Sequence, residues 1–289
     1  MIPPFTPRWR SLLFAPADNA KLLAKLHERG ADAVILDLED AIPCAGKAAA
    51  RAGIAAWIER LNGYNIPVVV RINAGWLDLY ADLNAVVRPG LTALMLPQVK
   101  DDLQVRAVDA ILDAMEQQRG LARRGIGLIA LIESPATLPH LPVIAALPRI
   151  IGLALGSEDF SLALRAPPSR ASLTLPCQMI ALAAAGQGLM ALGLPDTLAN
   201  FQHLDIYGAS IAQAQAMGMT GALCIHPAQV ALVNQAFAAS PEQRQWAERV
   251  VTAWTEAEAV GSAVCSVDGQ MVDRPVVERA RALLTQPRG

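Results

Sequence analysis

Short runs of aliphatic residues recur along the chain, separated by segments of a different pattern. The runs occupy residues 10–16, 33–40, 67–73, 93–99, 128–133, 150–159, 189–196 and 222–227. They read as strands buried on both faces, because such strands need no alternation of polar and apolar residues. Ala-rich segments with helical spacing lie between them, for example at 18–29, 45–61, 101–119, 172–188 and 206–217. The pattern predicts strands that alternate with crossover helices.

Eight such units favour an α/β fold in which a parallel sheet closes into a (β/α)8 TIM barrel; an open, doubly wound sheet is the alternative. Polar residues favour the barrel, because they gather where different runs end. They are Asp37, Glu39, Asp40, Arg71, Asn73, Gln98, Glu133, Glu158, Asp159, Asp196 and His226. A barrel brings all these ends to one face, where barrel enzymes keep their catalytic residues.

The pattern changes after the eighth run. Ser240 followed by Pro241 predicts a helix start. The segment "GSAVCSVDGQMVDRPVVERARALL" then predicts a hairpin that turns at Asp268-Gly269, followed by a last helix. A barrel does not need this segment. We therefore predict a barrel catalytic domain over 1–261 and a C-terminal hairpin-helix extension over 262–289, which acts as a lid or as an arm onto a neighbouring subunit.

Composition narrows the class of protein. With 53% hydrophobic and 17% charged residues, the 289-residue chain can bury a large core. A net charge of -2 and the lack of a basic block with interleaved aromatics argue against nucleic-acid binding. The four cysteines have no C-x-x-C spacing, so we expect buried free thiols and neither zinc nor disulfides. We also expect a cytoplasmic protein without a membrane span, because the opening "MIPPFTPRWR" lacks the apolar core of a secretory signal and no long apolar run follows.

Glu133 and Asp159 end consecutive aliphatic runs, so a barrel would place them side by side at its mouth. Two carboxylates suit Mg²⁺, which takes one or two protein oxygens and leaves its other positions to water and substrate. The alternative is that these acids cap the helices that begin at "ESPATL" and "SEDFSL".

Three other positions carry candidate chemistry. The planar guanidinium of Arg71 can bind a carboxylate at two points. Alternatively, Arg71 pairs with Asp37 and Glu39 of "LDLED", and the two roles are compatible. Lys21 and Lys25 share one face of the first predicted helix, where such a pair usually only solubilises the helix. His226 precedes Pro227 and has a structural role in this interpretation.

Several of these segments together resemble the citrate lyase β-chain family of CoA-thioester lyases, whose relatives include malyl-CoA and citramalyl-CoA lyases within the HpcH/HpaI aldolase superfamily. The matching segments are "RSLLFAPAD", "GADAVILDLEDAI", "VVVRIN", "LMLPQV", "LIALIESP", "GLALGSEDF", "ALCIHPAQVALVNQAF" and "VDGQMVDRPVVERAR". They occur in the family's order and span nearly the whole chain.

The resemblance implies a Mg²⁺-dependent barrel, usually trimeric, that cleaves a 3-hydroxy-3-carboxyacyl thioester into acetyl-CoA and a 2-oxo acid. It implies Glu133 and Asp159 as metal ligands and Arg71 as the ligand of the substrate carboxylate. Phe14, Lys21 and Lys25 fall where relatives contact CoA, and Asp196 lies near another ligand-contacting position. Asp273 in "MVDRP" matches an acid that relatives insert into a neighbour's active site, where it would transfer the proton of the acetyl-CoA enolate.

The resemblance leaves the substrate open among citramalyl-CoA, malyl-CoA and a citryl thioester, and between CoA and an acyl carrier protein as the thiol. Two other functions compete with this prediction. One is a class II pyruvate-dependent aldolase, which uses Glu and Asp ligands but no CoA. The other is a barrel that has lost activity and serves in regulation.

Overall fold

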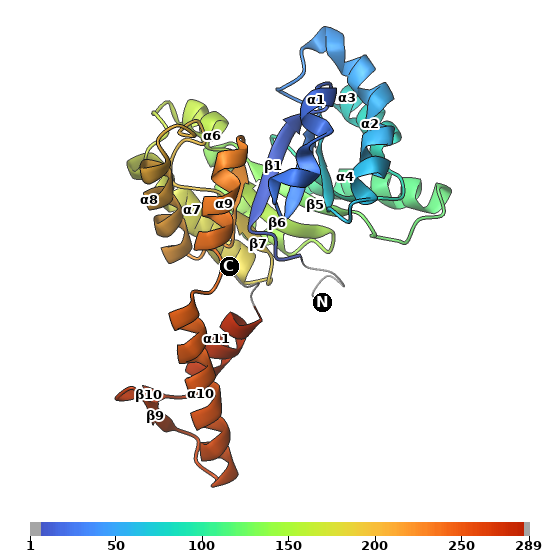
Figure 1. Cartoon of the computed structure of the whole chain (residues 1–289). Coiled ribbons are helices and arrows are strands. Elements are labelled where there is room, and N and C mark those ends of the chain that lie inside the picture. Colours follow the sequence, from blue (N-terminus) through green and yellow to red (C-terminus); the bar gives the residue numbers. More distant parts are fainter. Residues whose placement is uncertain (1–6, 286–289) are drawn as a thin grey trace. The chain divides into compact units, whose positions relative to one another are not determined.

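The computed structural model of the chain describes residues 7–285 and has one sheet of eight parallel strands with helices between them (Figure 1). The strands are β1 (Ser11–Pro16), β2 (Ala33–Asp37), β3 (Val68–Arg71), β4 (Leu91–Leu96), β5 (Gly127–Ile132), β6 (Ile150–Leu155), β7 (Met190–Leu192) and β8 (Ala222–Cys224). Each strand overlaps one of the predicted aliphatic runs. Except for β1, the strands end earlier than the runs do, because the last residues of the runs belong to the connections.

The sheet closes into a barrel. Its order is β7-β6-β5-β4-β3-β2-β1-β8, and a parallel bridge between Leu192 and Gly221 joins the two outer strands. The Gly193 N–H donates to the Gly221 carbonyl at 3.0 Å across this seam. A Cβ at Gly221 would lie 2.4 Å from the Arg10 carbonyl oxygen, so only glycine fits here. The predicted (β/α)8 barrel is therefore confirmed, and the open sheet is excluded.

The helices of the barrel follow the strands in alternation. They are α1 (Ala20–Leu23), α2 (Lys47–Asn62), α3 (Trp76–Val86), α4 (Asp102–Gln118), α5 (Leu141–Ala145), α6 (Ser157–Leu164), α7 (Arg170–Ala185), α8 (Leu204–Ala216) and α9 (Pro227–Ala236), with 3-10 helices η1 (Leu26–Arg29), η2 (Cys44–Gly46) and η3 (Pro135–His140). The continuous helix predicted over 18–29 is wrong. The Lys25 N–H bonds to the Leu22 carbonyl, three residues back, at 3.1 Å, so the chain tightens and continues as η1.

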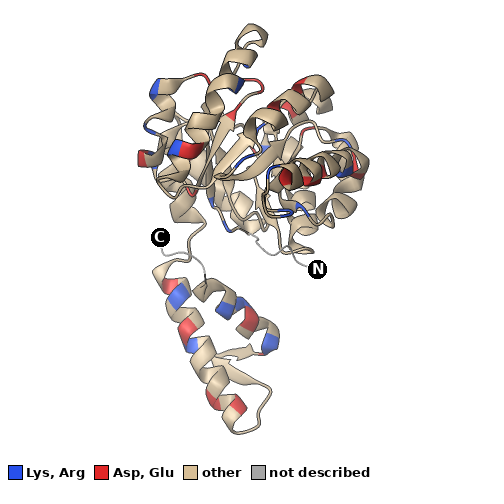
Figure 2. Ribbon diagram, turned by 90° about the vertical axis from the view of Figure 1, so that its right-hand side faces the viewer, with Lys and Arg blue, Asp and Glu red and all other residues tan. Residues whose placement is uncertain are grey.

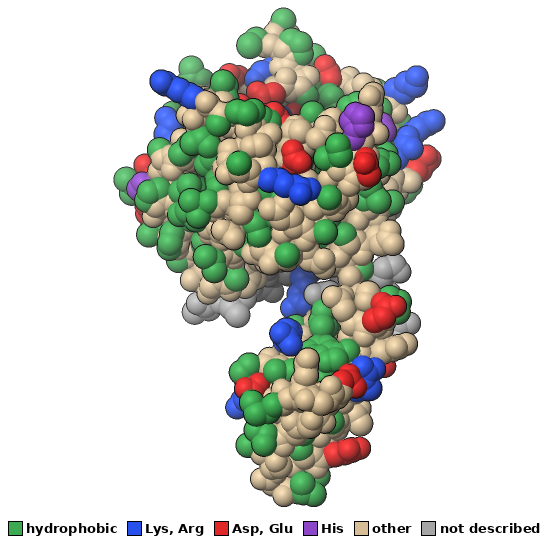
Figure 3. All heavy atoms as spheres, turned by 90° about the vertical axis from the view of Figure 1, so that its left-hand side faces the viewer, with side chains coloured by type: hydrophobic (Ala, Val, Ile, Leu, Met, Phe, Trp, Pro, Cys, Tyr) green, Lys and Arg blue, Asp and Glu red, His purple; other side chains and the backbone are tan. Residues whose placement is uncertain are grey.

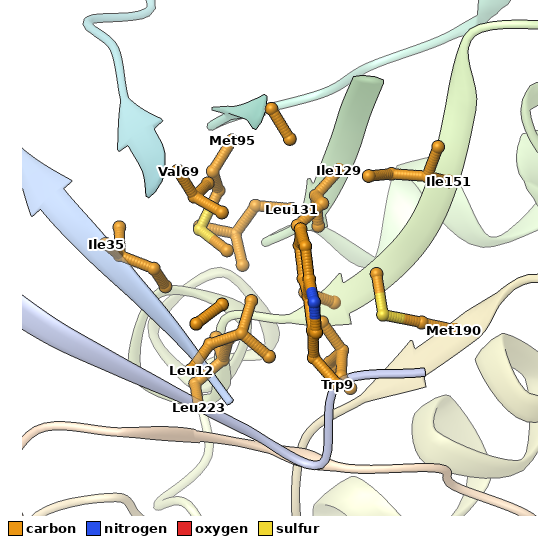
Figure 4. Packing of buried hydrophobic residues seen from close by; sticks show 14 residues of the cluster. Trp9, Leu12, Ile35, Val69, Met95, Ile129, Leu131, Ile151, Met190 and Leu223 are labelled. Carbon is orange, nitrogen blue, oxygen red and sulfur yellow. The ribbon is translucent and has the colours of Figure 1, made fainter. Parts of the chain in front are cut away.

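The interior of the barrel is a packed core. Side chains from all eight strands meet there with Trp9, and Figure 4 shows Leu12, Ile35, Val69, Ile129 and Met190 converging around it. Phe14 and Leu198 pack against the same cluster and are only partly buried. Stacked side chains fill the centre, as in other TIM barrels, so ligands have access only at the ends.

The chain divides into two compact units, with the boundary between Val233 and Asn234. The second unit contains α10 (Pro241–Ala259), β9 (Cys265–Val267), β10 (Gln270–Val272) and α11 (Arg274–Leu284). Acidic and basic residues follow one another along α10 (Figure 2). The helix start at Ser240 and the hairpin are confirmed, with φ of 52° at Asp268 and 77° at Gly269.

The boundary at 233/234 lies earlier than the one predicted at 261/262. The reason is that α10 belongs with the extension: Val250 and Trp254 share one apolar cluster with Val277 and Ala280 of α11. The apolar face of α10 thus has its partner within the second unit, and the sequence pattern alone did not reveal this.

Two predictions from composition can be compared with the structure. No helix between residues 7 and 285 is long and apolar enough to cross a membrane. All four cysteines are free; Cys177 and Cys224 are buried as expected, whereas Cys44 is exposed and Cys265 is partly buried.

Candidate active site

A cavity of about 380 Å³ opens at the C-terminal ends of the strands, where the polar residues were predicted to meet. It lies within the barrel unit. Its lining consists of Phe14, Ala15, Pro16, Asp37, Asp40, Ala41, Arg71, Leu131, Glu133, Gly156, Ser157, Glu158, Asp159, Leu198, Leu223 and Ile225. Arg71, Glu133, Asp159, Phe14 and Asp37 are therefore brought together as predicted.

Arg71 is held by acids from the neighbouring strand. It is the register partner of Asp37, and its Nε and Nη2 donate to the two Asp37 carboxylate oxygens at 2.8 and 2.7 Å. Its Nη1 lies 3.1 Å from Glu39 Oε2, without hydrogen-bond geometry, and donates to Asp40 at 3.3 Å. The guanidinium also lies over the Phe14 ring, 5.1 Å from its centroid. These contacts leave N–H groups of Arg71 available to a ligand.

Two unusual backbone positions fix Glu133 directly after β5. The Gln98 N–H donates to Glu133 Oε2 at 2.5 Å, and Gln98 itself has a φ of 49°, which is rare outside glycine. On the other side, a Cβ at Gly156 would lie 2.5 Å from Glu133 Cγ. Glycine at 156 therefore makes room for the carboxylate, whose Oε1 is left for a ligand.

Asp159 lies in the first turn of α6 and not at the strand end where it was predicted. Its carboxylate still reaches the same cavity. The alternative role of helix capping falls to other groups: the Ser134 hydroxyl accepts from the Ala136 N–H at the start of η3, and Gly156 precedes α6 without a side-chain cap.

The cavity and its immediate surroundings are rich in carboxyl groups. Burial raises the pKa of Glu133 to about 7, and the nearby Asp159 charge adds to this rise. Burial also raises the pKa of Glu39 to about 8, although Arg71 opposes the rise. The pKa of Asp159 is raised by burial and by Asp40. The site therefore has more acid groups than its one arginine can neutralise.

The donor set fits a cation that shares its ligands with a substrate. Within residues 7–285, no three His, Cys, Asp or Glu side chains come together as a metal site. The two carboxylates of Glu133 and Asp159 face one cavity, and an exposed octahedral Mg²⁺ site needs no more than this from a protein.

The other predicted residues lie outside the cavity lining. Lys21 and Lys25 are exposed, on α1 and before η1. Asp196 is engaged within the barrel, because it accepts from the Ser210 hydroxyl and the Thr197 N–H, both at 2.8 Å. Asp273 is the N-cap of α11 and accepts from the Val276 N–H at 3.3 Å.

The sequence analysis missed part of the site. Leu198, from the connection between β7 and α8, lines the cavity, as does Ser157, whose buried hydroxyl has no partner among the described residues. Asn73 was named among the polar strand ends, but its contacts were not predicted: it is buried, donates to the Leu38 carbonyl and to Asp82, and accepts from Lys47. No periodic signal marks such contacts, because they join segments distant in the sequence.

A parallel barrel that brings carboxylates and an arginine into one cavity at its strand ends has the architecture of a TIM-barrel enzyme. Residues 10–227 match the family described as HpcH/HpaI aldolase/citrate lyase. The chain belongs to this family and is an enzyme of its citrate lyase β-subunit-like branch of CoA-thioester lyases. The resemblance inferred from the sequence is thereby confirmed.

Curated relatives match over nearly their whole length. A citrate lyase subunit beta-like protein of Deinococcus radiodurans is 34% identical over 282 residues, which cover 96% of each chain. A (3S)-malyl-CoA thioesterase of Cereibacter sphaeroides is 30% identical over 284 residues, 96% of this chain and 94% of the relative. CitE of Mycobacterium tuberculosis in complex with magnesium, acetoacetate and coenzyme A is 31% identical, with a TM-score of 0.73 over 97% of this chain and 98% of that one.

Proposed function

We propose that the protein is a Mg²⁺-dependent carbon-carbon lyase that cleaves a 3-hydroxy-3-carboxyacyl thioester to acetyl-CoA and a 2-oxo acid. The substrate class comprises citramalyl-CoA, malyl-CoA and citryl thioesters. The single observation that carries the proposal is that Glu133, Asp159 and Arg71 line one cavity at the strand ends. The CitE structures that contain magnesium with coenzyme A, or with oxaloacetate, support the same assignment.

Glu133 and Asp159 would hold the Mg²⁺. The cation would supply positive charge that stabilises the negative charge of the substrate. Arg71 would bind the same carboxylate with the N–H groups that its contacts to Asp37 and Asp40 leave available. Asp37 and Glu39 hold the guanidinium in place, so it is oriented before the substrate arrives.

The reaction breaks the bond between the hydroxyl-bearing carbon and the carbon next to the thioester. The hydroxyl loses its proton to solvent water and becomes the ketone of the 2-oxo acid, while the electrons of the broken carbon-carbon bond move onto the thioester carbonyl as an enolate. A proton delivered to the enolate carbon completes acetyl-CoA. Asp273 of a neighbouring subunit is the proposed donor of this proton, which makes the second unit an arm of a homo-oligomer, with the trimer as the expected form.

The thiol carrier would bind outside the cavity. Phe14 lines the cavity beside Arg71, and the exposed Lys21 and Lys25 are free to contact the phosphates of CoA. We assign Asp196 a smaller contribution to ligand binding, because its carboxylate already accepts hydrogen bonds from Ser210 and Thr197. An acyl carrier protein would present the same thioester on a phosphopantetheine arm and is the alternative carrier.

The experiment that tests this function follows the products. Purified protein is incubated with each thioester, with Mg²⁺ or with EDTA, and free CoA, acetyl-CoA and the 2-oxo acid are each quantified. A lyase yields equal amounts of acetyl-CoA and 2-oxo acid in the presence of Mg²⁺ only. Free CoA without a 2-oxo acid would show a thioesterase instead, and turnover of a free hydroxy-oxo acid alone would show the aldolase.

A further inference from the structure

The cavity is lined by two kinds of side chain. Arg71 and the acids make up its charged lining, which we call the acid wall. Phe14, Leu131, Leu198, Leu223 and Ile225 make up its apolar lining, which we call the apolar wall. Leu131 and Leu223 belong to the barrel core, Phe14 and Leu198 pack against that core, and the Phe14 ring also lies 5.1 Å from the Arg71 guanidinium. A ligand that fills the cavity would therefore meet both charged and apolar side chains.

The three substrate candidates differ in one substituent on the hydroxyl-bearing carbon. It is a hydrogen in malyl-CoA, a methyl group in citramalyl-CoA and a carboxymethyl group in the citryl thioester. All three have the carboxylate that Mg²⁺ and Arg71 would bind. The citryl thioester alone brings a further carboxylate, which needs a second cation. Arg71 is the only Lys or Arg among the residues that line the described cavity, and it already faces Asp37, Glu39 and Asp40.

Two residues of the apolar wall are linked by hydrogen bonds to one buried side chain. Gln229 on α9 is fully buried. Its Nε2 donates to the Leu198 carbonyl at 2.9 Å, while its Oε1 accepts from the Ile225 N–H at 2.8 Å and from the His226 N–H at 3.1 Å. A single amide thus fixes the two residues, Leu198 and Ile225, that come from connections and not from the core.

Glu158 of the acid wall forms a hydrogen bond with the connection that carries Leu198. The Thr197 hydroxyl donates to Glu158 Oε1 at 2.5 Å, one residue before Leu198. The position of Leu198 relative to the acids is therefore set from both sides. This is the arrangement expected of a residue that selects a substituent, because selection by shape requires a wall that does not move aside.

We propose that the natural substrate carries a small alkyl group on its hydroxyl-bearing carbon, so that the 2-oxo acid is pyruvate or a close homologue. Leu198 and Ile225 determine this specificity, and Gln229 positions them. The inference rests on the proposed lyase function and narrows its substrate. A methyl group in an apolar pocket discriminates by about 10-fold or more against its absence, and an unpaired carboxylate is rejected more strongly.

The test compares kcat/KM for citramalyl-CoA, malyl-CoA and citryl-CoA with the full-length protein in Mg²⁺. We expect them to fall in that order, by about 10-fold or more at each step. Calorimetry with the products provides a second readout: pyruvate should bind more tightly than oxaloacetate. Leu198→Arg adds a cation to the apolar wall and should reverse the order between citramalyl-CoA and citryl-CoA. Ala199→Arg adds the same charge on the next, exposed residue and should leave the order unchanged.

Gln229→Met has nearly the same size but makes none of the three hydrogen bonds. It should lower the ratio of citramalyl-CoA to malyl-CoA turnover toward one while Mg²⁺ affinity stays the same; if this variant does not fold, the Leu198 variants still decide. A wild-type preference for citryl-CoA, or a Leu198→Arg variant with an unchanged order, would overturn the inference and leave the lyase function standing. Failure to cleave any of the thioesters would instead remove the proposed function, and this inference with it.

Discussion

Glu133 and Asp159 reach the cavity from different elements, one directly after β5 and the other from the first turn of α6. We expect Glu133→Gln and Asp159→Asn each to lower kcat by more than about 100-fold, because losing one charged ligand costs on the order of several kcal/mol of transition-state stabilisation. The measurement is kcat at saturating Mg²⁺, together with Mg²⁺ affinity by calorimetry. Glu59→Gln, at an exposed position of α2, serves as the control. Near wild-type turnover in either cavity variant would refute the metal assignment.

Arg71 is proposed to bind the substrate carboxylate through its planar guanidinium, and a single ammonium cannot reproduce such a two-point contact. Arg71→Lys should therefore lose nearly as much kcat/KM as Arg71→Ala. The Lys variant keeps a positive charge beside Asp37 and Glu39, whereas the Ala variant leaves these acids buried and uncompensated and should lower the melting temperature further. If Arg71→Lys kept most of its kcat/KM, the arginine would be a structural partner of the acids and not a substrate ligand.

Among single residues, the sequence predicted those whose position at the cavity follows from their place at the end of an aliphatic run. Glu133 and Arg71 follow aliphatic runs, so their arrival at one face needed only the barrel. The contacts that make the site were not predictable. They depend on segments that only the fold brings together. Examples are the positive φ of Gln98, the space that Gly156 leaves for Glu133, and the hydrogen bonds of Gln229.

Between elements, a buried network behind Arg71 joins β3, α3 and α2. Asp82 on α3 is fully buried and accepts from the Asn73 N–H and Nδ2, each at 2.7 Å, and from Arg51 Nε at 2.5 Å. Asn73 in turn donates to the Leu38 carbonyl, between Asp37 and Glu39, at 3.0 Å. The network therefore sets where the strand ends that carry the acids and Arg71 lie.

Asp82→Ala should lower the free energy of unfolding by about 3 kcal/mol or more, because it leaves buried donors and an arginine without their partner. Asp78→Ala is the matched control: Asp78 pairs with the same Arg51, but its side chain is 54% exposed. Its loss should cost at most about 1 kcal/mol. Urea unfolding of both variants gives the two values, and equal losses would show that burial does not control the contribution of this network.

Elements were predicted better than their boundaries were. All eight strands were found because strands covered on both faces have nearly continuous aliphatic runs. The first helix was predicted too long, because side-chain periodicity does not distinguish an α-helix from a turn of α-helix followed by a 3-10 helix. The unit boundary was placed too late, since the amphipathic pattern of α10 does not tell whether its apolar face packs on the barrel or on α11.

For the whole molecule, the exterior of the barrel has a region with few charged residues. Between Arg170 and Glu242 the only acidic or basic residues, leaving His aside, are Asp196 and Asp205. On α7, Leu175 is 62% exposed and Leu182 is 74% exposed. Figure 3 shows hydrophobic side chains across this side of the barrel unit, with few charges among them. Such a surface suits a second copy of the chain better than a charged partner, which supports the proposed homo-oligomer.

An oligomer allows a decisive test of Asp273. Asp273→Asn removes the acid but preserves the start of α11, because asparagine caps helices as well as aspartate does. We expect this variant to fold normally, to bind Mg²⁺ and to be inactive, whereas Asp273→Ala should also lose about 1 kcal/mol of stability.

The decisive measurement mixes Asp273→Asn with Glu133→Gln under conditions in which subunits exchange. If Asp273 acts in a neighbour's site, some sites combine an intact Glu133 from one chain with an intact Asp273 from another, and activity returns. A mixture that exchanges subunits and stays inactive would mean that Asp273 serves its own barrel or serves only as a cap.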